Sequence, residues 1–246
     1  MTNPAPITFQ QLWRYKAAAG TEAAARQDAA IVELESELMK GRPYSEVMRR
    51  SEPWFSTWSQ GKKLTDKPHP EAGILLRVPY FSQNDNASGT GYRECFSSSC
   101  AMVAAFYGKV TGDDAYNKIR AQFGDSTNSE AQIATLRHLG LSARLVTNCT
   151  AAFLEGALAA GRPVPVGWLH KGPSTAPTGG GHWTVVIGCT PTDWIHNDPN
   201  GEADLVGGGY VNHSGGAGIH YSRKNWGRRW EADGPATGWA LDVRPQ

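Results

Sequence analysis

The fold of this protein is decided by a polar loop that runs directly into a helix, residues 92–103, with the sequence YRECFSSSCAMV. Small hydroxyl residues fill the first turn, and small and apolar residues then recur at helical spacing, which gives the helix a face to bury. Gly108 supplies the stop. The sequence therefore predicts a helix over residues 95–107 with Cys95 in its first turn.

Cys95 lies where a thiol can become reactive. The thiolate is the nucleophilic form of cysteine, and a helix N-terminus near an imidazolium favours that form. The alternative interpretation is an inert, partly buried cysteine in an ordinary helix. The other cysteines are Cys100, Cys149 and Cys189, too few for a disulfide scaffold and without the Cys-x-x-Cys pairs of a zinc ribbon, so we expect free thiols.

A candidate base stands in the second half of the chain, in residues 179–188, GGGHWTVVIG. This pattern puts His182 at the mouth of an aliphatic strand, after glycines that leave room for a substrate. Alternation along the strand places His182, Thr184 and Val186 on one face, so the imidazole can point into a cleft. The alternative is a hydrogen-bonded structural histidine.

Two further residues complete the candidate site. A catalytic imidazole needs a partner on its second nitrogen, and residues 194–201, WIHNDPNG, offer Asp198 on what should be the adjacent strand. Asn197 could do the same, but a neighbour in a strand points to the opposite face, and Asp-Pro-Asn-Gly is also an ordinary turn. Upstream, the amide of Gln83 could donate to a developing oxyanion along with the Cys95 backbone N–H.

The remaining segments indicate an α+β fold. We expect further helices over residues 129–140, opened by a capping box of Ser129 and Gln132, and over residues 150–161. Strands are expected over residues 74–80, 163–168, 183–188 and 239–243. Helices come first and strands later, which is typical of α+β proteins. The aromatic and basic segment 221–230 could form a groove wall for a sugar-peptide polymer or a packed aromatic hairpin.

The chain divides into an extension and one catalytic-sized domain. Residues 1–72 are predicted to form a helical N-terminal extension and linker, because apolar residues recur at helical spacing before a polar, Pro- and Gly-bearing stretch at 61–70. The domain is expected over residues 73–246. We interpret the extension as a helical cap on that domain, with a docking arm or an inhibitory segment as alternatives.

Composition narrows the class of protein. A chain of 246 residues with 40% hydrophobic content can bury one full core. The formal net charge of +1 gives no electrostatic reason to expect a nucleic-acid partner or an anionic membrane. The first residues lack a basic start followed by an apolar run, and no stretch is long enough to span a bilayer. We therefore expect a monomer without signal peptide that folds in a cytoplasm.

Together these residues resemble the papain-like cysteine peptidases typified by those that remove double-glycine leaders from bacteriocins. The resemblance covers residues 78–243 and rests on a Pro-Tyr-x-x-Gln segment, a Glu-Cys helix start with a later Met, a Gly-His-aliphatic strand and an Asp-Pro turn. It implies a papain-like fold in which Cys95 is the nucleophile, His182 the general base and Asp198 the residue that orients it. It also implies Gln83 as oxyanion donor, and no cofactor.

One position departs from the family pattern. The family usually has glycine and proline after the nucleophile, and this chain has Phe96 and Ser97. A bulky Phe96 could narrow the acyl site, so we expect altered specificity rather than lost activity.

The resemblance to phage-encoded members implies a substrate as well. We expect an endolysin that hydrolyses peptide or amide bonds of peptidoglycan. The alternatives are a protease that processes proteins or leader peptides, and a catalytically silent virion or binding module of the same fold. A metal hydrolase is disfavoured, because the chain has no His-Glu-x-x-His motif and His196 with Asp198 makes an incomplete ligand set.

Overall fold

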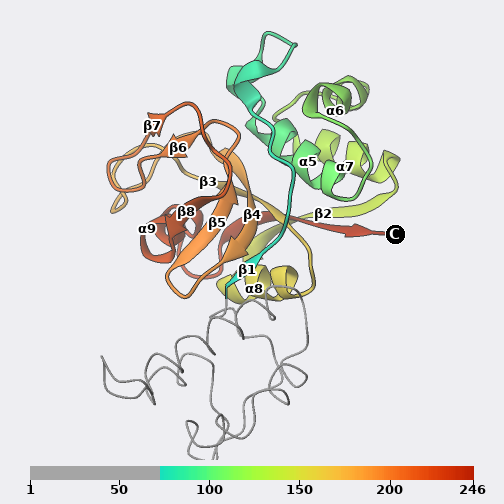
Figure 1. Ribbon diagram of the computed structural model, residues 1–246. Helices are drawn as coiled ribbons and strands as arrows, with labels where there is room; N and C mark the ends of the chain where they lie inside the picture. The colour runs from blue at the N-terminus through green and yellow to red at the C-terminus, as the bar shows by residue number, and fades with distance from the viewer. Residues whose placement is uncertain (1–72) are drawn as a thin grey trace, which may run out of the picture. The chain divides into compact units, whose positions relative to one another are not determined.

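The computed structural model describes residues 73–246, so the helices expected in residues 1–72 lie outside the described residues. Three helices stand together on one side of the sheet: α5 (Cys95–Phe106), α6 (Asp113–Arg120) and α7 (Ser129–His138) (Figure 1). The helix predicted over residues 95–107 is confirmed to within one residue. The sequence analysis missed α6, whose acidic first turn and basic last turn suit the helix dipole.

The start of α7 differs from the predicted capping box. Its N-cap is Asn128, whose side-chain oxygen accepts hydrogen bonds from the first backbone amides of the helix. Gln132 does not reach back to cap the helix. It is buried, and its amide donates to the Ser97 hydroxyl on α5 at 2.9 Å. The residue that looked like a cap therefore ties two helices together.

Two β-sheets form the other half of the domain. The main sheet has the order β2-β9-β3-β4-β5-β8, and β1 lies beside β4. Neighbouring strands from β2 to β8 in this order pair antiparallel. Its strands are β1 (Ile74–Leu75), β2 (Leu141–Cys149), β3 (Val164–Trp168), β4 (His182–Cys189), β5 (Asp193–Asn197), β8 (Ile219–Ser222) and β9 (Gly238–Pro245). A separate ribbon pairs β6 (Glu202–Ala203) with β7 (Tyr210–Asn212). The fold is α+β and papain-like, as predicted.

The segment before the helices is less regular than predicted. Only Ile74–Leu75 pairs as a strand, and the chain then runs past the sheet to two short 3-10 turns, η2 (Gln83–Asp85) and η3 (Gly91–Arg93) (Figure 1). Pro79 has no N–H to give to a ladder, which limits strand pairing here. Thus the segment from β1 to η3 connects the sheet half with the start of α5.

Two helices pack against the sheet away from the α5 group. The first, α8 (Ala151–Ala159), is capped by the Thr150 side chain, close to the helix predicted over residues 150–161. The second, α9 (Arg223–Trp230), occupies the segment expected to be a groove wall or a hairpin. Trp226 and Trp230 are buried and stack on one another, with ring centroids 5.0 Å apart. Rings that lie inside the protein offer no surface to a glycan, so the groove-wall interpretation is wrong.

Phe96 joins the two halves of the domain. Its side chain is 2% exposed, and its ring lies 3.6 Å from that of Trp183 on β4, nearly parallel. Gly167, the cross-strand partner of Trp183 on β3, also lies against the indole, and an added Cβ there would press on the ring atoms at about 3 Å. Phe96 thus points into the core between helix and sheet, and the expectation that it narrows the acyl site is wrong.

Replacing Phe96 with alanine is expected to lower the free energy of unfolding by about 3–5 kcal/mol, because it deletes a buried aromatic ring and leaves a cavity against Trp183. Chemical denaturation of the two proteins measures the difference. A matched control is Tyr92→Ala, since that side chain is 79% exposed and its loss should change stability by no more than about 0.5 kcal/mol. Equal stability of Phe96→Ala and the parent would contradict the structural role given to the stack.

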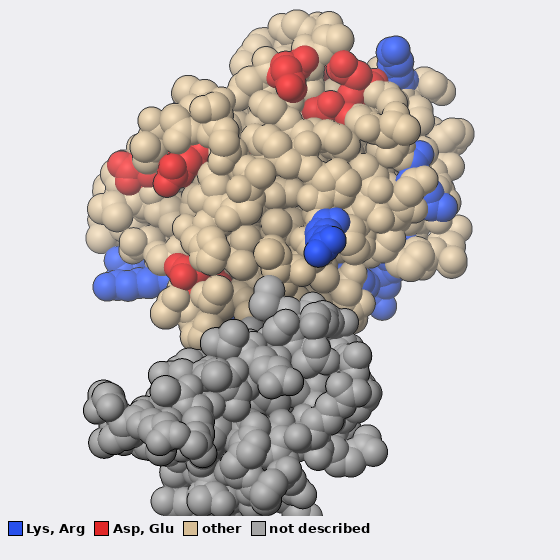
Figure 2. Space-filling view, viewed as in Figure 1, with Lys and Arg blue, Asp and Glu red and all other residues tan. Residues whose placement is uncertain are grey.

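Figure 2 shows no patch of basic side chains on the face that it draws. On that face Lys and Arg stand apart from one another, whereas acidic side chains gather at the top of the described part. Among the helices that lie within residues 73–246, none is long and apolar enough to cross a membrane.

Candidate active site

Cys95 is the most accessible thiol of the chain. It begins α5 and is partly exposed, whereas Cys100, Cys149 and Cys189 are buried. Burial raises the pKa of the Cys149 thiol to about 12 and moves the pKa of Cys100 well above its ordinary value. Those two thiols therefore stay protonated. Cys189 is buried as well, so Cys95 is the candidate nucleophile.

His182 lies between Cys95 and Asp198. It is buried at the first position of β4, and its Nε2 is 2.8 Å from the Asp198 Oδ1. This leaves Nδ1 for the Cys95 side chain, with which the ring also shares a hydrogen bond. Burial lowers the pKa of His182, but the charge of Asp198 and the hydrogen bonds to Asp198 and Cys95 outweigh it and raise this pKa to about 10. The arrangement favours an imidazolium beside the thiol.

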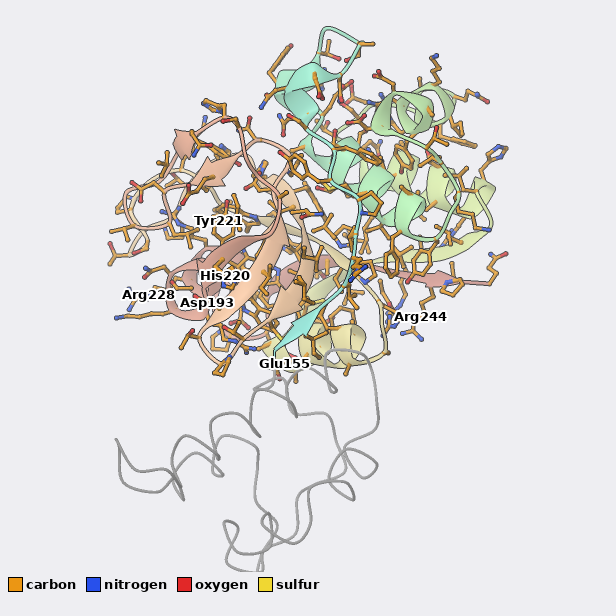
Figure 3. All side chains as sticks on the ribbon, in the orientation of Figure 1. Glu155, Asp193, His220, Tyr221, Arg228 and Arg244 are labelled. Atoms are coloured by element: carbon orange, nitrogen blue, oxygen red, sulfur yellow. The ribbon has the colours of Figure 1, made fainter. Side chains whose placement is uncertain are left out.

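Asp198 is fully buried and well supplied with donors. Besides His182, its carboxylate accepts hydrogen bonds from the Tyr221 hydroxyl at 2.9 Å, the Asn200 backbone amide at 2.9 Å and the Tyr210 hydroxyl at 3.4 Å. Tyr221 extends from β8, the edge strand of the sheet (Figure 3). A buried carboxylate with this many donors keeps its position, which in turn fixes the ring of His182.

The backbone around Asp198 is packed closely as well. The Asp198 N–H donates to the Gly216 carbonyl at 2.8 Å, and a Cβ on Gly216 would collide with the Asp198 carbonyl oxygen. The Tyr80 hydroxyl donates to that same carbonyl at 3.2 Å. Only a glycine fits where these two chain segments cross.

Asn197 points away from the histidine. Its side-chain amide donates to the carbonyls of Val78 and Pro79 at 3.2 and 3.4 Å, and its oxygen accepts from the Gly218 N–H at 3.0 Å. Strand alternation therefore places Asp198, and not Asn197, against His182. Asn197 anchors the segment that leads to Gln83.

Gln83 is held from both halves of the domain. Its backbone N–H donates to the Pro199 carbonyl at 2.8 Å, next to Asp198 in the chain. Its side-chain Nε2 donates to the Gly91 carbonyl at 2.8 Å, in the turn that leads to Cys95. The side chain is buried and uses one of its two amide hydrogens in that bond, so the second remains for another acceptor.

Glu94, the residue before Cys95, belongs to the Glu-Cys motif but was given no role from the sequence. It is buried, and its carboxylate accepts hydrogen bonds from Asn86 at 2.7 Å, Ser88 at 2.8 Å and Thr90 at 3.0 Å. These contacts fold the loop between Gln83 and Cys95 around one buried side chain. Its place immediately before the candidate nucleophile was the one signal in the sequence.

His196 takes part in a buried network under the site. Its Nδ1 lies 2.9 Å from the Thr184 hydroxyl, which also accepts a hydrogen bond from the Trp168 indole at 3.2 Å. Burial lowers the pKa of His196 to about 3, so the ring is neutral. Within residues 73–246 no group of three or more His, Cys, Asp or Glu side chains is placed to hold a metal ion.

Tyr221→Phe is expected to lower kcat/KM about tenfold, because it removes the shortest hydroxyl bond to Asp198 and bonds to a charged group are the stronger ones. Steady-state kinetics of the purified variant measures the change. Tyr80→Phe is the matched control, since that hydroxyl donates to the backbone carbonyl of Asp198 and not to its carboxylate. A larger loss in Tyr80→Phe than in Tyr221→Phe would contradict this assignment.

Comparison with known proteins gives one family. Residues 75–232 match the model of the Peptidase_C39 like family. No curated protein matches the chain.

Several solved structures are similar to the described fold. A protein from Bacillus anthracis described as a C39-like peptidase superposes with a TM-score of 0.51 at 14% identity, over 71% of this chain and 98% of that one. A double-glycine-motif protease from an AMS/PCAT transporter, solved with a leader peptide, has a TM-score of 0.45 at 19% identity, over 70% of this chain and 94% of that one. The peptidase domain of Streptococcus ComA, a bi-functional ABC transporter, has a TM-score of 0.42 at 19% identity, over 63% and 93%. The likeness to the Bacillus anthracis structure is one of fold.

Proposed function

Since the chain belongs to the Peptidase_C39 like family and is a hydrolase of the cysteine-peptidase type, we propose that Cys95, His182 and Asp198 form its catalytic triad. The observation that carries this proposal is the buried pair of His182 and Asp198, 2.8 Å apart, which also shares a hydrogen bond with the partly exposed Cys95. Asp198 orients the imidazole and holds it protonated. The thiol proton then rests on His182, and the sulfur is left as thiolate.

The proposed reaction has two halves. In the first, the Cys95 sulfur attacks the carbonyl carbon of the substrate, and the oxygen takes up the negative charge. The second amide hydrogen of Gln83 and the Cys95 backbone N–H stabilise that oxyanion. When the carbon–nitrogen bond breaks, His182 gives its proton to the leaving amine. In the second half, water attacks the thioester, His182 accepts a water proton, and the acid leaves as the thiolate returns.

The substrate that we propose is the peptide part of bacterial peptidoglycan, which would make the protein a phage endolysin. Stem peptides carry diamino acids with a cationic amine, and three carboxylates lie near one another beside the N-terminal part of α5. Asp85 follows Gln83, and Asp113 and Asp114 begin α6, where the Asp113 carboxylate accepts a hydrogen bond from Ser98 of α5. These groups suit a cationic side chain on the substrate.

Purified protein is expected to lower the turbidity of isolated sacculi, and of Gram-negative cells whose outer membrane has been made permeable. It should release new amino groups without new reducing sugar ends, because the triad cuts amides and not glycosidic bonds. Colorimetric assays of both groups in the digest make the measurement, with Cys95→Ser as the inactive control.

A second candidate is favoured by the family itself, whose typical members remove double-glycine leaders. Intact sacculi together with cleavage of a Gly-Gly leader peptide would replace the endolysin proposal by leader processing. Hydrolysis of neither substrate, with Cys95 alkylated no faster than Cys100, Cys149 and Cys189, would instead indicate a silent module of the same fold.

A further inference from the structure

His170 lies next to the proposed catalytic histidine and has no role in the triad. It follows β3 by two residues, and its ring centroid is 5.6 Å from that of His182 and 6.2 Å from that of Tyr210. Trp168 and Tyr210 also make T-shaped ring contacts with His182, each with its ring centroid 5.5 Å from that of His182. Three rings thus surround the imidazole, and His170 is the one among them that can act as a base.

The backbone that carries His170 is fixed on both sides. The fully buried guanidinium of Arg229 on α9 donates to the carbonyls of Leu169, Lys171 and Gly172 at 3.1, 3.2 and 2.8 Å. The carbonyl of His170 itself accepts the Gly209 N–H at 2.7 Å. A buried cation that binds three carbonyls of one short segment fixes the conformation of that segment. The fold therefore determines where the His170 side chain begins.

The ring nitrogens of His170 are without hydrogen-bond partners in the part of the chain that the structure describes. Nδ1 is buried and unpaired. Burial, followed by the charges of His182 and Lys171, lowers the pKa of His170 to about 4, so the ring is neutral near neutral pH and carries one proton. A buried N–H without an acceptor is rarer than a buried acceptor without a donor. We therefore assign the proton to Nε2 of this half-buried ring.

The place of His170 identifies the part of the substrate that it can meet. His182 must give its proton to the leaving nitrogen, so the residues after the cleaved bond pass beside the His182 ring. In the proposed reaction Gln83 and the Cys95 N–H would instead bind the oxygen of the reacting carbonyl. We propose that His170 is a substrate-binding residue whose Nε2–H donates to a main-chain carbonyl of the leaving segment. This inference rests on the proposed hydrolase function.

The test compares two substrates with the same acyl part. The first is the peptide that the wild type cleaves in the digestions above, with its natural leaving segment. The second is the methyl ester of the same acyl part, whose leaving group has no carbonyl. With the full-length chain, His170→Ala is expected to lower kcat/KM for the peptide about three- to tenfold, as loss of a neutral hydrogen bond does, and for the ester less than twofold.

Two further variants sharpen the result. His170→Gln keeps an amide N–H donor and should restore most of the activity toward the peptide. Lys171→Ala changes the next side chain of the same segment and should leave the ratio of the two substrates unchanged. Equal losses on both substrates in His170→Ala, or no loss on either, would overturn the inference. If the wild type cleaves neither sacculi nor a leader peptide in those digestions, the hydrolase proposal fails and this inference fails with it.

Discussion

Cys95→Ser is expected to reduce hydrolysis by about a thousandfold or more while leaving the fold unchanged. Serine has nearly the same size, but its hydroxyl is far less acidic than a thiol, and an imidazolium paired with Asp198 cannot draw off its proton as a free base would. Turnover of the wild-type substrate and the circular dichroism spectrum of the variant make the measurement. Retained activity would remove the central claim.

Cys100→Ala is the matched control for Cys95→Ser. Cys100 is on the same helix but is buried, so its loss should leave turnover close to that of the wild type. Iodoacetamide should alkylate Cys95 much faster than the three buried cysteines and stop the reaction, whereas EDTA should leave the rate unchanged. Activity lost in EDTA and restored by zinc would indicate a metal enzyme instead.

The parts of the fold that could be predicted are those that depend on residues close together in the sequence. The helix that begins at Cys95 follows a polar loop and ends at Phe106, two residues before Gly108, and the strand that begins at His182 is a largely aliphatic run, so both were found close to their true bounds. Strand alternation also favoured Asp198 over Asn197, and it is the Asp198 carboxylate that lies 2.8 Å from His182. In each case the information lies within about ten residues of the chain.

The residues that were missed depend on contacts between distant segments. Tyr221 and Tyr210 meet Asp198 from strands that follow it by 23 and 12 residues, and nothing in their own neighbourhoods marks them. Phe96 could not be oriented from the sequence, because its partner Trp183 lies in the other half of the domain. Partner choice across the core is a property of the packed protein and not of a local pattern.

The segment 221–230 shows a different kind of error. Its Trp and Arg residues are of the types that stack on glycans, so a groove wall was one of two interpretations of the segment, beside a packed aromatic hairpin. The same residue types also build cores when each polar atom finds a partner: the Trp230 indole donates to the Trp239 carbonyl at 3.0 Å, and Arg229 binds backbone carbonyls. Composition alone could not distinguish a buried aromatic helix from an exposed one.

His182→Ala is expected to lower kcat/KM by at least about a hundredfold, since it removes the group that takes and returns the proton in both halves of the reaction. The pH profile of wild-type activity should give a second test of the role of His182. The charged thiolate–imidazolium pair is lost when His182 loses its proton, so activity should fall on the alkaline side as pH rises through about 10, the raised pKa of this ring. Steady-state kinetics across pH measures both effects.

Asp198→Asn tests the cause of that alkaline limb. Asp198 supplies the charge that raises the pKa of His182 above the ordinary value of 6.5, so the variant should lose activity at a pH lower by about 1–3 units. The same pair stabilises the folded protein: its contribution is complete below pH 6.5 and disappears as pH rises through about 10, so the variant should lose stability mainly below that limit. An alkaline limb that does not move in Asp198→Asn, together with a severe loss in Asn197→Ala, would assign the orienting role to Asn197.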